Sequence, residues 1–148
     1  MAGKTAEQGA DAPLYREFEH TGDMGIEVWA PTRAELFRRA SIALGSLLVE
    51  RAGVSAIERR EVAVRAESDA DLMHDLLAEL LDLFVVDAFI WRDAVVEEQE
   101  GGLRAIVEGE KFDPSRHEFL GEIKAVTYHQ LSVEHLSDRW TARVIFDV

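Results

Sequence analysis

Cysteine is absent from the 148-residue sequence, and lysine, proline and tryptophan are scarce. Without thiols the chain can form neither a disulfide framework nor a thiolate zinc site. No apolar run approaches the roughly 20 residues that a membrane-spanning helix needs. The start of the chain also lacks the apolar core of a signal peptide. We therefore predict a cytoplasmic protein with no membrane contact, a disordered extension over residues 1–13 and a single domain over residues 14–148.

The familiar signatures of catalysis are also missing. The sequence contains no G-x-S-x-G elbow, no phosphate-binding loop and no dinucleotide fingerprint. Five histidines are present, but none has the H-E-x-x-H spacing of a zinc helix. We predict that the protein is not an enzyme, and we expect His74 and His135 to be surface residues.

Negative charge is in excess and is unevenly spread. The formal net charge is −13, and residues 67–100 contain eleven acids against one base, Arg92. Such a surface repels phosphate backbones, so we expect no autonomous nucleic-acid binding. It favours a basic protein partner, which the field attracts and orients. The alternative is that the charge serves solubility, or that the proteins of the host are acidic in general.

Two helices are predicted from apolar spacing and from capping residues. The first begins near Thr32, because Thr32 and Glu35 form a capping box ahead of apolar residues at helical intervals. The second covers residues 69–86 and has a leucine-rich stripe, an acidic face and Ser68 as a plausible N-terminal cap.

Most of the remaining sequence has the pattern of β-strands. Hairpin turns are predicted at Gly101-Gly102 and at Ser137-Asp138. The sequence therefore predicts an α+β fold, a two-layer sandwich in which two helices pack on one face of a largely antiparallel sheet of about six to seven strands. The expected strands are residues 15–19, 25–29, 61–67, 89–99, 103–109, 122–136 and 139–148.

The last two residues, Asp147 and Val148, follow an apolar, β-rich segment with no polar tail after it. Because termini usually fray, an apolar strand that runs to the final carboxylate suggests that this carboxylate is held in place. An Asp side chain beside a terminal carboxylate would offer several oxygen ligands to a hard cation. The turn-like segment 19–25 offers a third acid.

Lys124 stands out because the chain uses thirteen arginines and only three lysines. A lysine in a strand of such a chain hints at a need for a compact ammonium group rather than a planar guanidinium. The alternative is that Lys124 is a surface lysine that arose by chance.

Four segments together resemble the archease family. Residues 19–26, E-H-T-G-D-M-G-I, resemble an E-H-T-A-D-x-G-I signature, and residues 109–113 with His117 resemble a G-E-x-x-D…H stretch. Residues 124–129 match K-A-V-T-Y-H, and residues 145–148 match the characteristic I-F-D-V ending. The resemblance covers roughly residues 15–148. It departs from the family at Gly22, where alanine is usual, and in the N-terminal extension.

Archeases are small cytoplasmic proteins that activate the GTP-dependent tRNA-splicing RNA ligase of the RtcB class. The resemblance implies a protein cofactor that helps this ligase load guanylate onto its active-site histidine and turn over repeatedly. It implies that Asp23, Asp147 and Val148 hold a divalent cation. Such oxygen ligands suit calcium most, with magnesium or manganese possible, rather than zinc. The residues that would serve activation of the partner are Lys124, His20 and His129.

Two other functions stay open at this point. One is a general chaperone or a modulator of tRNA-modifying enzymes, for which the acidic second helix offers a surface. The other is a metal-dependent hydrolase that uses His20, Asp23 and His129, although the sequence clusters few ligands for it.

Overall fold

The structure is a computed structural model that describes residues 15–148. The predicted extension over residues 1–13 lies outside the described residues. Within them, neither α-helix is long and apolar enough to cross a membrane. In chain order the elements are β1 (Tyr15–His20), β2 (Asp23–Ala30), α1 (Arg33–Leu48), the short 3-10 helix η1 (Arg51–Gly53), β3 (Glu58–Arg65), α2 (Asp69–Asp87), β4 (Phe89–Gln99), β5 (Gly102–Lys111), β6 (Ala125–Val126), β7 (Ser132–Leu136) and β8 (Arg139–Asp147).

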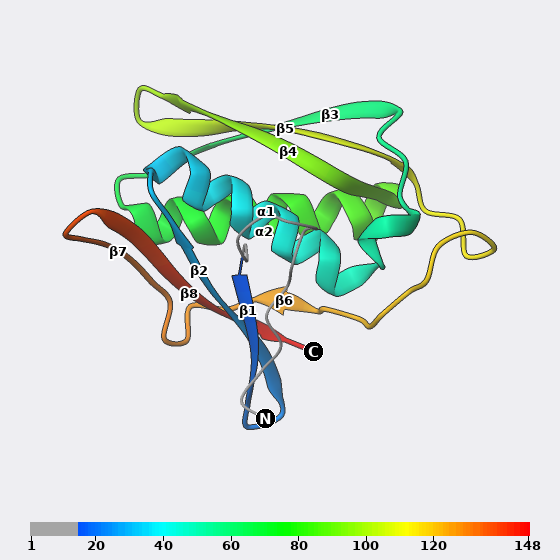
Figure 1. Ribbon diagram of the computed structural model, residues 1–148, viewed down its shortest axis with the longest axis horizontal. Helices are drawn as coiled ribbons and strands as arrows, with labels where there is room; N and C mark the ends of the chain where they lie inside the picture. The colour runs from blue at the N-terminus through cyan, green and yellow to red at the C-terminus, as the bar shows by residue number, and fades with distance from the viewer. Residues whose placement is uncertain (1–14) are drawn as a thin grey trace.

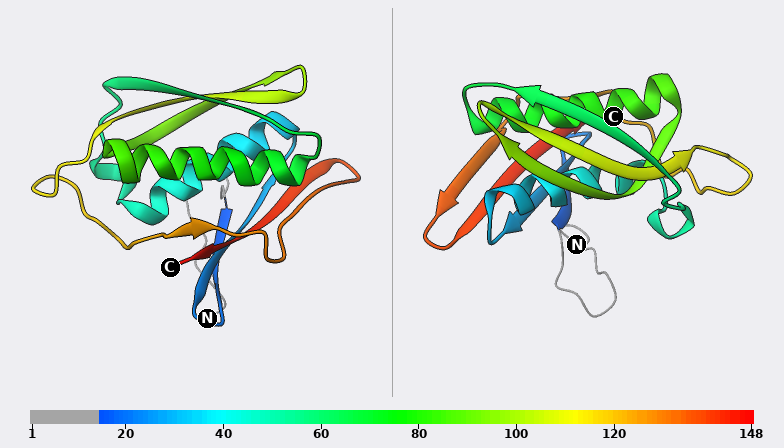
Figure 2. Two further views of the ribbon diagram at one scale, coloured as in Figure 1. Left: turned by 180° about the vertical axis from the view of Figure 1, so that it is seen from behind. Right: turned by 90° about the horizontal axis from the view of Figure 1, so that it is seen from above.

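The strands form two antiparallel sheets with both helices between them (Figure 1). One sheet has five strands in the order β1-β2-β8-β6, with β7 also paired to β8, and the other has the order β3-β5-β4. Seen from behind, α2 lies between β3 above and β6 and β7 below (Figure 2). The predicted α+β class is confirmed.

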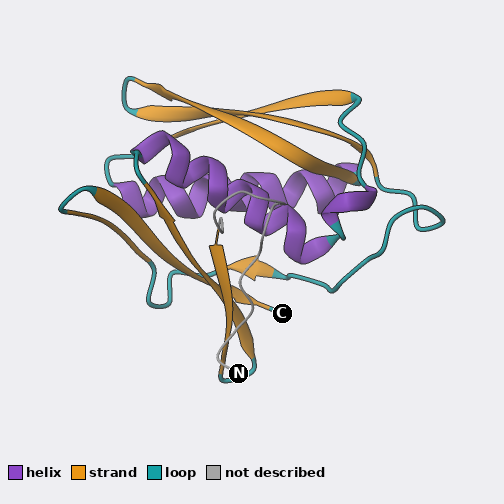
Figure 3. Ribbon diagram, in the orientation of Figure 1, coloured by secondary structure: helices purple, strands orange, loops and turns teal. Residues whose placement is uncertain are grey.

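The predicted arrangement of layers needs correction, because the helices do not cover one face of a single sheet (Figure 3). The reason lies in α1, where every residue from Ala40 to Leu44 is buried. Five consecutive residues cover more than one turn, so the helix is buried on all sides there. A helix that is apolar all round belongs between two layers rather than on an outer surface.

Both predicted helix caps are present. The Thr32 hydroxyl accepts a hydrogen bond from the Glu35 main-chain N–H at 3.2 Å, and the Ser68 hydroxyl accepts one from Asp71 at 3.1 Å. Only half of the capping box forms, because the Glu35 carboxylate accepts instead from Arg38 and Arg39. These caps satisfy amides that would otherwise lack partners in the first helical turn.

Tight turns set the register of the hairpins. Thr21 and Gly22 both have positive φ, 43° and 86°, which suits the two-residue turn of a right-twisted hairpin. As a result β1 and β2 extend closer to the turn than predicted, and His20 pairs directly with Asp23. The single strand predicted over residues 122–136 is instead divided into β6 and β7, with Gln130 at a φ of 52° between them.

Trp91 joins β4 to α1 inside the core. Its side chain is buried, and its indole N–H donates to the main-chain oxygen of Ser41 at 2.8 Å. The same ring lies against Gly45, where an added Cβ would come within 2.8 Å of the indole nitrogen. The hydrogen bond fixes the ring, so it cannot move aside at low cost.

We expect Gly45→Ala to lower the free energy of unfolding by up to about 2 kcal/mol, because overpacking costs about 1–3 kcal/mol and the gain in helix propensity offsets only about 1 kcal/mol. Urea denaturation would measure the difference. Gly121→Ala is the matched control, since a Cβ at Gly121 meets nothing within 4 Å. Equal stabilities for the two variants would contradict the assigned packing of Trp91.

Candidate functional site

The ends of β1, β2 and β8 bring three predicted site residues into one row. His20 on β1 pairs with Asp23 on β2. Met24 on β2 pairs with Phe146 on β8, so continuing the same antiparallel register by one residue places Asp23 beside Asp147. Side chains at directly opposed positions point to the same face of a sheet. Phe146 belongs to the core beneath the helices, so by alternation Asp147 and its neighbours lie on the outer face.

Lys124 is held at the same end of the sheet by the main chain of β8. Its N–H donates to the carbonyl of Asp147 at 2.7 Å, and Ala125 pairs with Asp147. Two residues later the hydroxyl of Thr127 donates to the carbonyl of Ile145 at 2.8 Å. The side chain of Lys124 is exposed, so its ammonium group is available to a partner.

His129 folds back over His20. The ring centroids of the two histidines are 5.1 Å apart, and the planes are tilted by 58°. The N–H of His129 donates to the Thr127 hydroxyl, which closes the turn that carries it. Nδ1 of His20 is buried and has no hydrogen-bond partner among residues 15–148. We call the following six residues the strand-end site: His20, Asp23, Lys124, His129, Asp147 and Val148.

The donor chemistry of the strand-end site suits a hard cation. Within residues 15–148, no three side chains of His, Cys, Asp or Glu gather closely enough to hold a metal ion. The strand-end site contains two acids, so a cation there would take two carboxylates from Asp23 and Asp147. An oxygen of Val148 and water molecules would supply its remaining ligands. Calcium, magnesium and manganese accept such oxygen ligands, whereas zinc favours nitrogen and sulfur.

His74 connects α2 to Val126 and Tyr128, in the segment between Lys124 and His129, and the sequence did not predict this contact. Its Nδ1 lies 2.9 Å from a carboxylate oxygen of Asp75, and its Nε2 lies 3.2 Å from the carbonyl of Val126. Its ring stacks on Tyr128 at 4.0 Å, and only 19% of its side chain is exposed. Both partners are acceptors, so the two hydrogen bonds form together only when both ring nitrogens carry protons. The expectation of a simple surface residue is wrong.

Glu110 and His117, from the second family-like segment, form a buried network away from the strand-end site. The Glu110 carboxylate accepts from Arg116 at 2.5 Å, from the main chain of Ser55 at 2.6 Å and from His117 at 3.0 Å. Nδ1 of His117 accepts from the Asp113 N–H, so Nε2 is the donor to Glu110. The network ties the end of β5 to the loops around it, which indicates a structural role.

The hydrogen bonds from Arg116 and from the Ser55 main chain lower the pKa of Glu110 from 4.5 to about 2. A carboxyl whose pKa is lower in the folded state stabilises the fold above its unfolded pKa. That contribution is lost as the pH falls from about 4.5 through about 2.

We expect Glu110→Gln to have a lower free energy of unfolding than the wild type at pH 6. The difference between the two should become smaller as the pH falls towards 2. Urea denaturation across this pH range would measure it. Glu118→Gln is the control, because Glu118 is an exposed acid in the same loop region. A gap for Glu110→Gln that stays constant with pH would contradict the lowered pKa.

Comparison with known proteins gives a family for the chain. Residues 15–148 match the model of the Archease protein family. The protein archease of Methanosarcina acetivorans is 37% identical over 139 residues, which cover 90% of this chain and 95% of the relative. The protein archease of Pyrococcus abyssi is also 37% identical, with coverage of 90% and 98%. These names describe no catalysed reaction, in keeping with the prediction of a protein that is not an enzyme.

Two solved structures share the fold. The solution structure of Methanobacterium thermoautotrophicum protein 1598 superposes with a TM-score of 0.74 at 28% identity, covering 91% of this chain and 99% of the other. A crystal structure from Thermotoga maritima, described as an archease and possible chaperone, gives a TM-score of 0.64 at 23% identity, with coverage of 88% and 94%. The family match and the relatives' identity show that this chain belongs to the archease family.

Proposed function

We propose that the protein activates a GTP-dependent RNA ligase of the RtcB class in tRNA splicing and RNA repair. In this role it promotes guanylylation of the ligase histidine and allows each ligase molecule to turn over repeatedly. Membership in the archease family supports the proposal. The observation that carries it is the strand-end site, where residues more than 100 positions apart in the sequence meet at the ends of paired strands.

The chemistry of the strand-end site suits contact with the catalytic apparatus of such a ligase. The exposed ammonium of Lys124 is a compact cation that can pair with a phosphate or a carboxylate of the partner. The rings of His20 and His129 lie against each other at the same end of the sheet. The protein contributes no nucleophile of its own in this scheme, so it acts by positioning and by charge.

The net charge of −13 indicates which component is contacted. A strongly negative protein is repelled by RNA phosphates, so contact with the ligase protein is favoured over contact with its RNA substrate. A basic surface on the ligase would be attracted and oriented by the same field.

A divalent cation fits this role by stabilising the strand ends. Two carboxylates on neighbouring strands, Asp23 and Asp147, repel each other, and a bound cation removes that cost. The main chain of Asp147 also accepts the hydrogen bond from Lys124. A cation at the two acids would therefore fix the backbone from which Lys124 projects. Calcium is the preferred candidate, followed by magnesium or manganese.

A second candidate is a general chaperone, because the Thermotoga maritima archease is described as a possible chaperone. A chaperone would suppress the aggregation of many unrelated proteins, whereas an activator would act on one ligase.

The first experiment is multiple-turnover ligation by the cognate ligase with GTP and divalent metal, at substoichiometric amounts of this protein. We expect Lys124→Ala and Asp23→Ala each to reduce turnovers per ligase by about tenfold or more, which corresponds to about 1.4 kcal/mol. Lys111→Ala is the matched control, because Lys111 lies on β5 and donates to the carbonyl of Asp87, away from the strand ends.

Circular dichroism would confirm that each variant is folded. Full activation by both site variants would refute the site assignment. No activation by the wild type with a competent ligase would refute the proposed function, and a test of aggregation suppression would then examine the chaperone.

For the cation, we expect Asp147→Asn to weaken calcium binding by about tenfold or more, because one charged oxygen donor is lost. Isothermal titration calorimetry with calcium alone would measure the affinity. Asp138→Asn, in the turn at the opposite end of β8, is the control. Calcium binding of equal strength in the wild type, Asp23→Asn and Asp147→Asn would exclude a site at these residues.

A further inference from the structure

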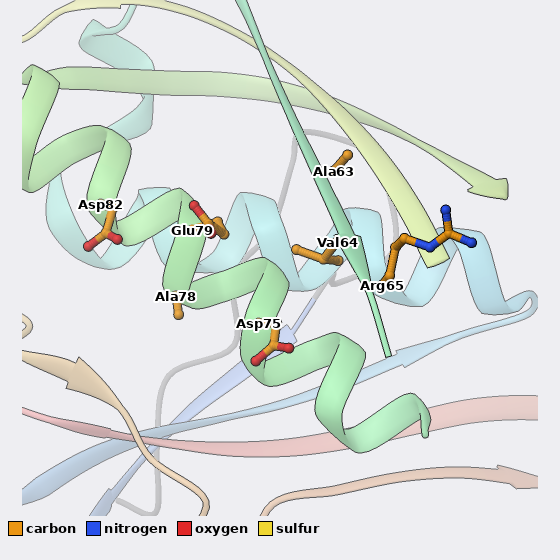
Figure 4. Close-up of a pocket in the computed structure, with 7 residues that line it drawn as sticks. All are labelled: Ala63, Val64, Arg65, Asp75, Ala78, Glu79 and Asp82. Atoms are coloured by element: carbon orange, nitrogen blue, oxygen red, sulfur yellow. The ribbon is translucent and has the colours of Figure 1, made fainter. Parts of the chain in front are cut away.

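An open groove lies between β3 and α2, on the three-stranded sheet and away from the strand-end site. Two adjoining cavities of about 300 Å³ and 350 Å³ form it. They share Ala63 on β3 and Glu79 and Asp82 on α2, so they are parts of one groove that follows the strand. Figure 4 shows the wall formed by α2 facing β3 across this space.

The strand that borders the groove is an edge strand with free hydrogen-bonding groups. Among residues 15–148, β3 pairs only with β5. The N–H of Ala66 donates to the carbonyl of Gly101, and the carbonyl of Val64 points at Gly102, where an added Cβ would lie 2.2 Å from it. In an antiparallel ladder, alternate residues face the partner strand. The main-chain N–H and C=O groups of Ala63 and Glu61 therefore point into the groove.

The opposite wall of the groove is negatively charged. Asp75, Glu79 and Asp82 follow one another along α2 beside β3 (Figure 4). Within the described part of the chain, Glu79 and Asp82 have no hydrogen-bond or ion-pair partner for their carboxylates. Arg65 is the basic residue of the groove, but its guanidinium donates to the carbonyl of Glu100 at the β4–β5 hairpin. Carboxylates without partners favour a cationic occupant.

We propose that this groove is a docking site for a basic, extended segment of a partner protein, which adds to the edge of β3 as a further strand. Its main chain would bond to Ala63 and Glu61, and its alternate side chains, lysine or arginine, would lie over Glu79 and Asp82. Alternate residues of a strand are about 6.6–6.8 Å apart. Glu79 and Asp82 are separated by about 4.5 Å along the helix axis. The difference of about 2 Å is within the reach of the long, flexible side chains of lysine and arginine.

The two features of the groove select the occupant together. The open strand edge selects an extended peptide, since strand addition is a known mode of peptide recognition. The carboxylates select positive charge and disfavour nucleic acid. The site does not depend on ligase activation, because it lies on the opposite sheet from the strand-end site.

The test uses a fluorescein-labelled peptide of about seven residues in which lysine and threonine alternate, long enough to span about 23 Å as a strand. Fluorescence anisotropy would measure binding, and the glutamate–threonine peptide is the negative probe. We expect saturable binding of the lysine peptide alone. We also expect it to protect the Ala63 and Glu61 amides of the wild type from hydrogen exchange.

Two variants separate the contribution of the backbone from that of charge. Ala63→Pro removes one N–H from the open edge and leaves the ladder to β5 intact, so we expect at least a tenfold loss of affinity. Glu79→Lys with Asp82→Lys should abolish binding. The matched control carries Glu118→Lys with Asp138→Lys, an equal change of net charge at exposed positions outside the groove.

Loss of binding in the control as well as in the groove variant would show attraction by net charge alone and would overturn the proposal. Undiminished binding by a folded Ala63→Pro variant would also overturn it. If that variant does not fold, the exchange measurement on the wild type decides, and unprotected amides at Ala63 and Glu61 would exclude strand addition.

Discussion

The pairing of β8 on both of its edges is the constraint on which the functional half of the molecule depends. One edge pairs with β2, and the other pairs with β6 and β7. Because the register of an antiparallel ladder is fixed residue by residue, the placement of Phe146 opposite Met24 also places Asp147 beside Asp23. A shift of one residue would turn Asp147 towards the core and Phe146 towards solvent. Core packing and site geometry are therefore maintained by the same ladder.

The layer of helices imposes the second constraint. Both helices contact both sheets, so each must be apolar on more than one side. α2 combines buried leucines with a row of exposed acids, and these acids lie beside the edge of β3. Four of the eleven acids in residues 67–100 thus line the space between α2 and the edge of β3: Asp75, Glu79, Asp82 and Asp87.

Local sequence signals predicted the local structure well. Thr32 and Ser68 cap the helices as expected, and the turn at Ser137-Asp138 joins its strands as expected. The turn predicted at Gly101-Gly102 is one residue earlier, at Glu100-Gly101, because Gly102 already pairs with Gln99. These features depend on a few neighbouring residues, so they can be inferred from a short segment. The position of both helices between two sheets was not predicted. Periodicity identifies the apolar side of a helix but not the element that covers it.

The candidate site shows the same limit. The segments that contain Asp23, Lys124 and Asp147 could be selected from the sequence, and the strand register brings them to one end of the sheet. His74 could not be selected, since its acidic neighbours suggested solvent exposure. Its contacts with Val126 and Tyr128 cross more than 50 residues of sequence and exist only once α2 lies over β6.

His74 and Asp75 are adjacent on α2, and through them the helix contacts both the groove beside β3 and the segment that follows Lys124. Asp75 lines the groove beside β3 and lies 2.9 Å from Nδ1 of His74, whose Nε2 lies 3.2 Å from the carbonyl of Val126. Val126 pairs with Phe146, which directly precedes Asp147. Consecutive residues of one helix therefore contact the groove on one side and the strand that leads from Lys124 on the other. A displacement of this helical turn would therefore change the contact of His74 with the Val126 carbonyl and move Asp75 along the groove at the same time.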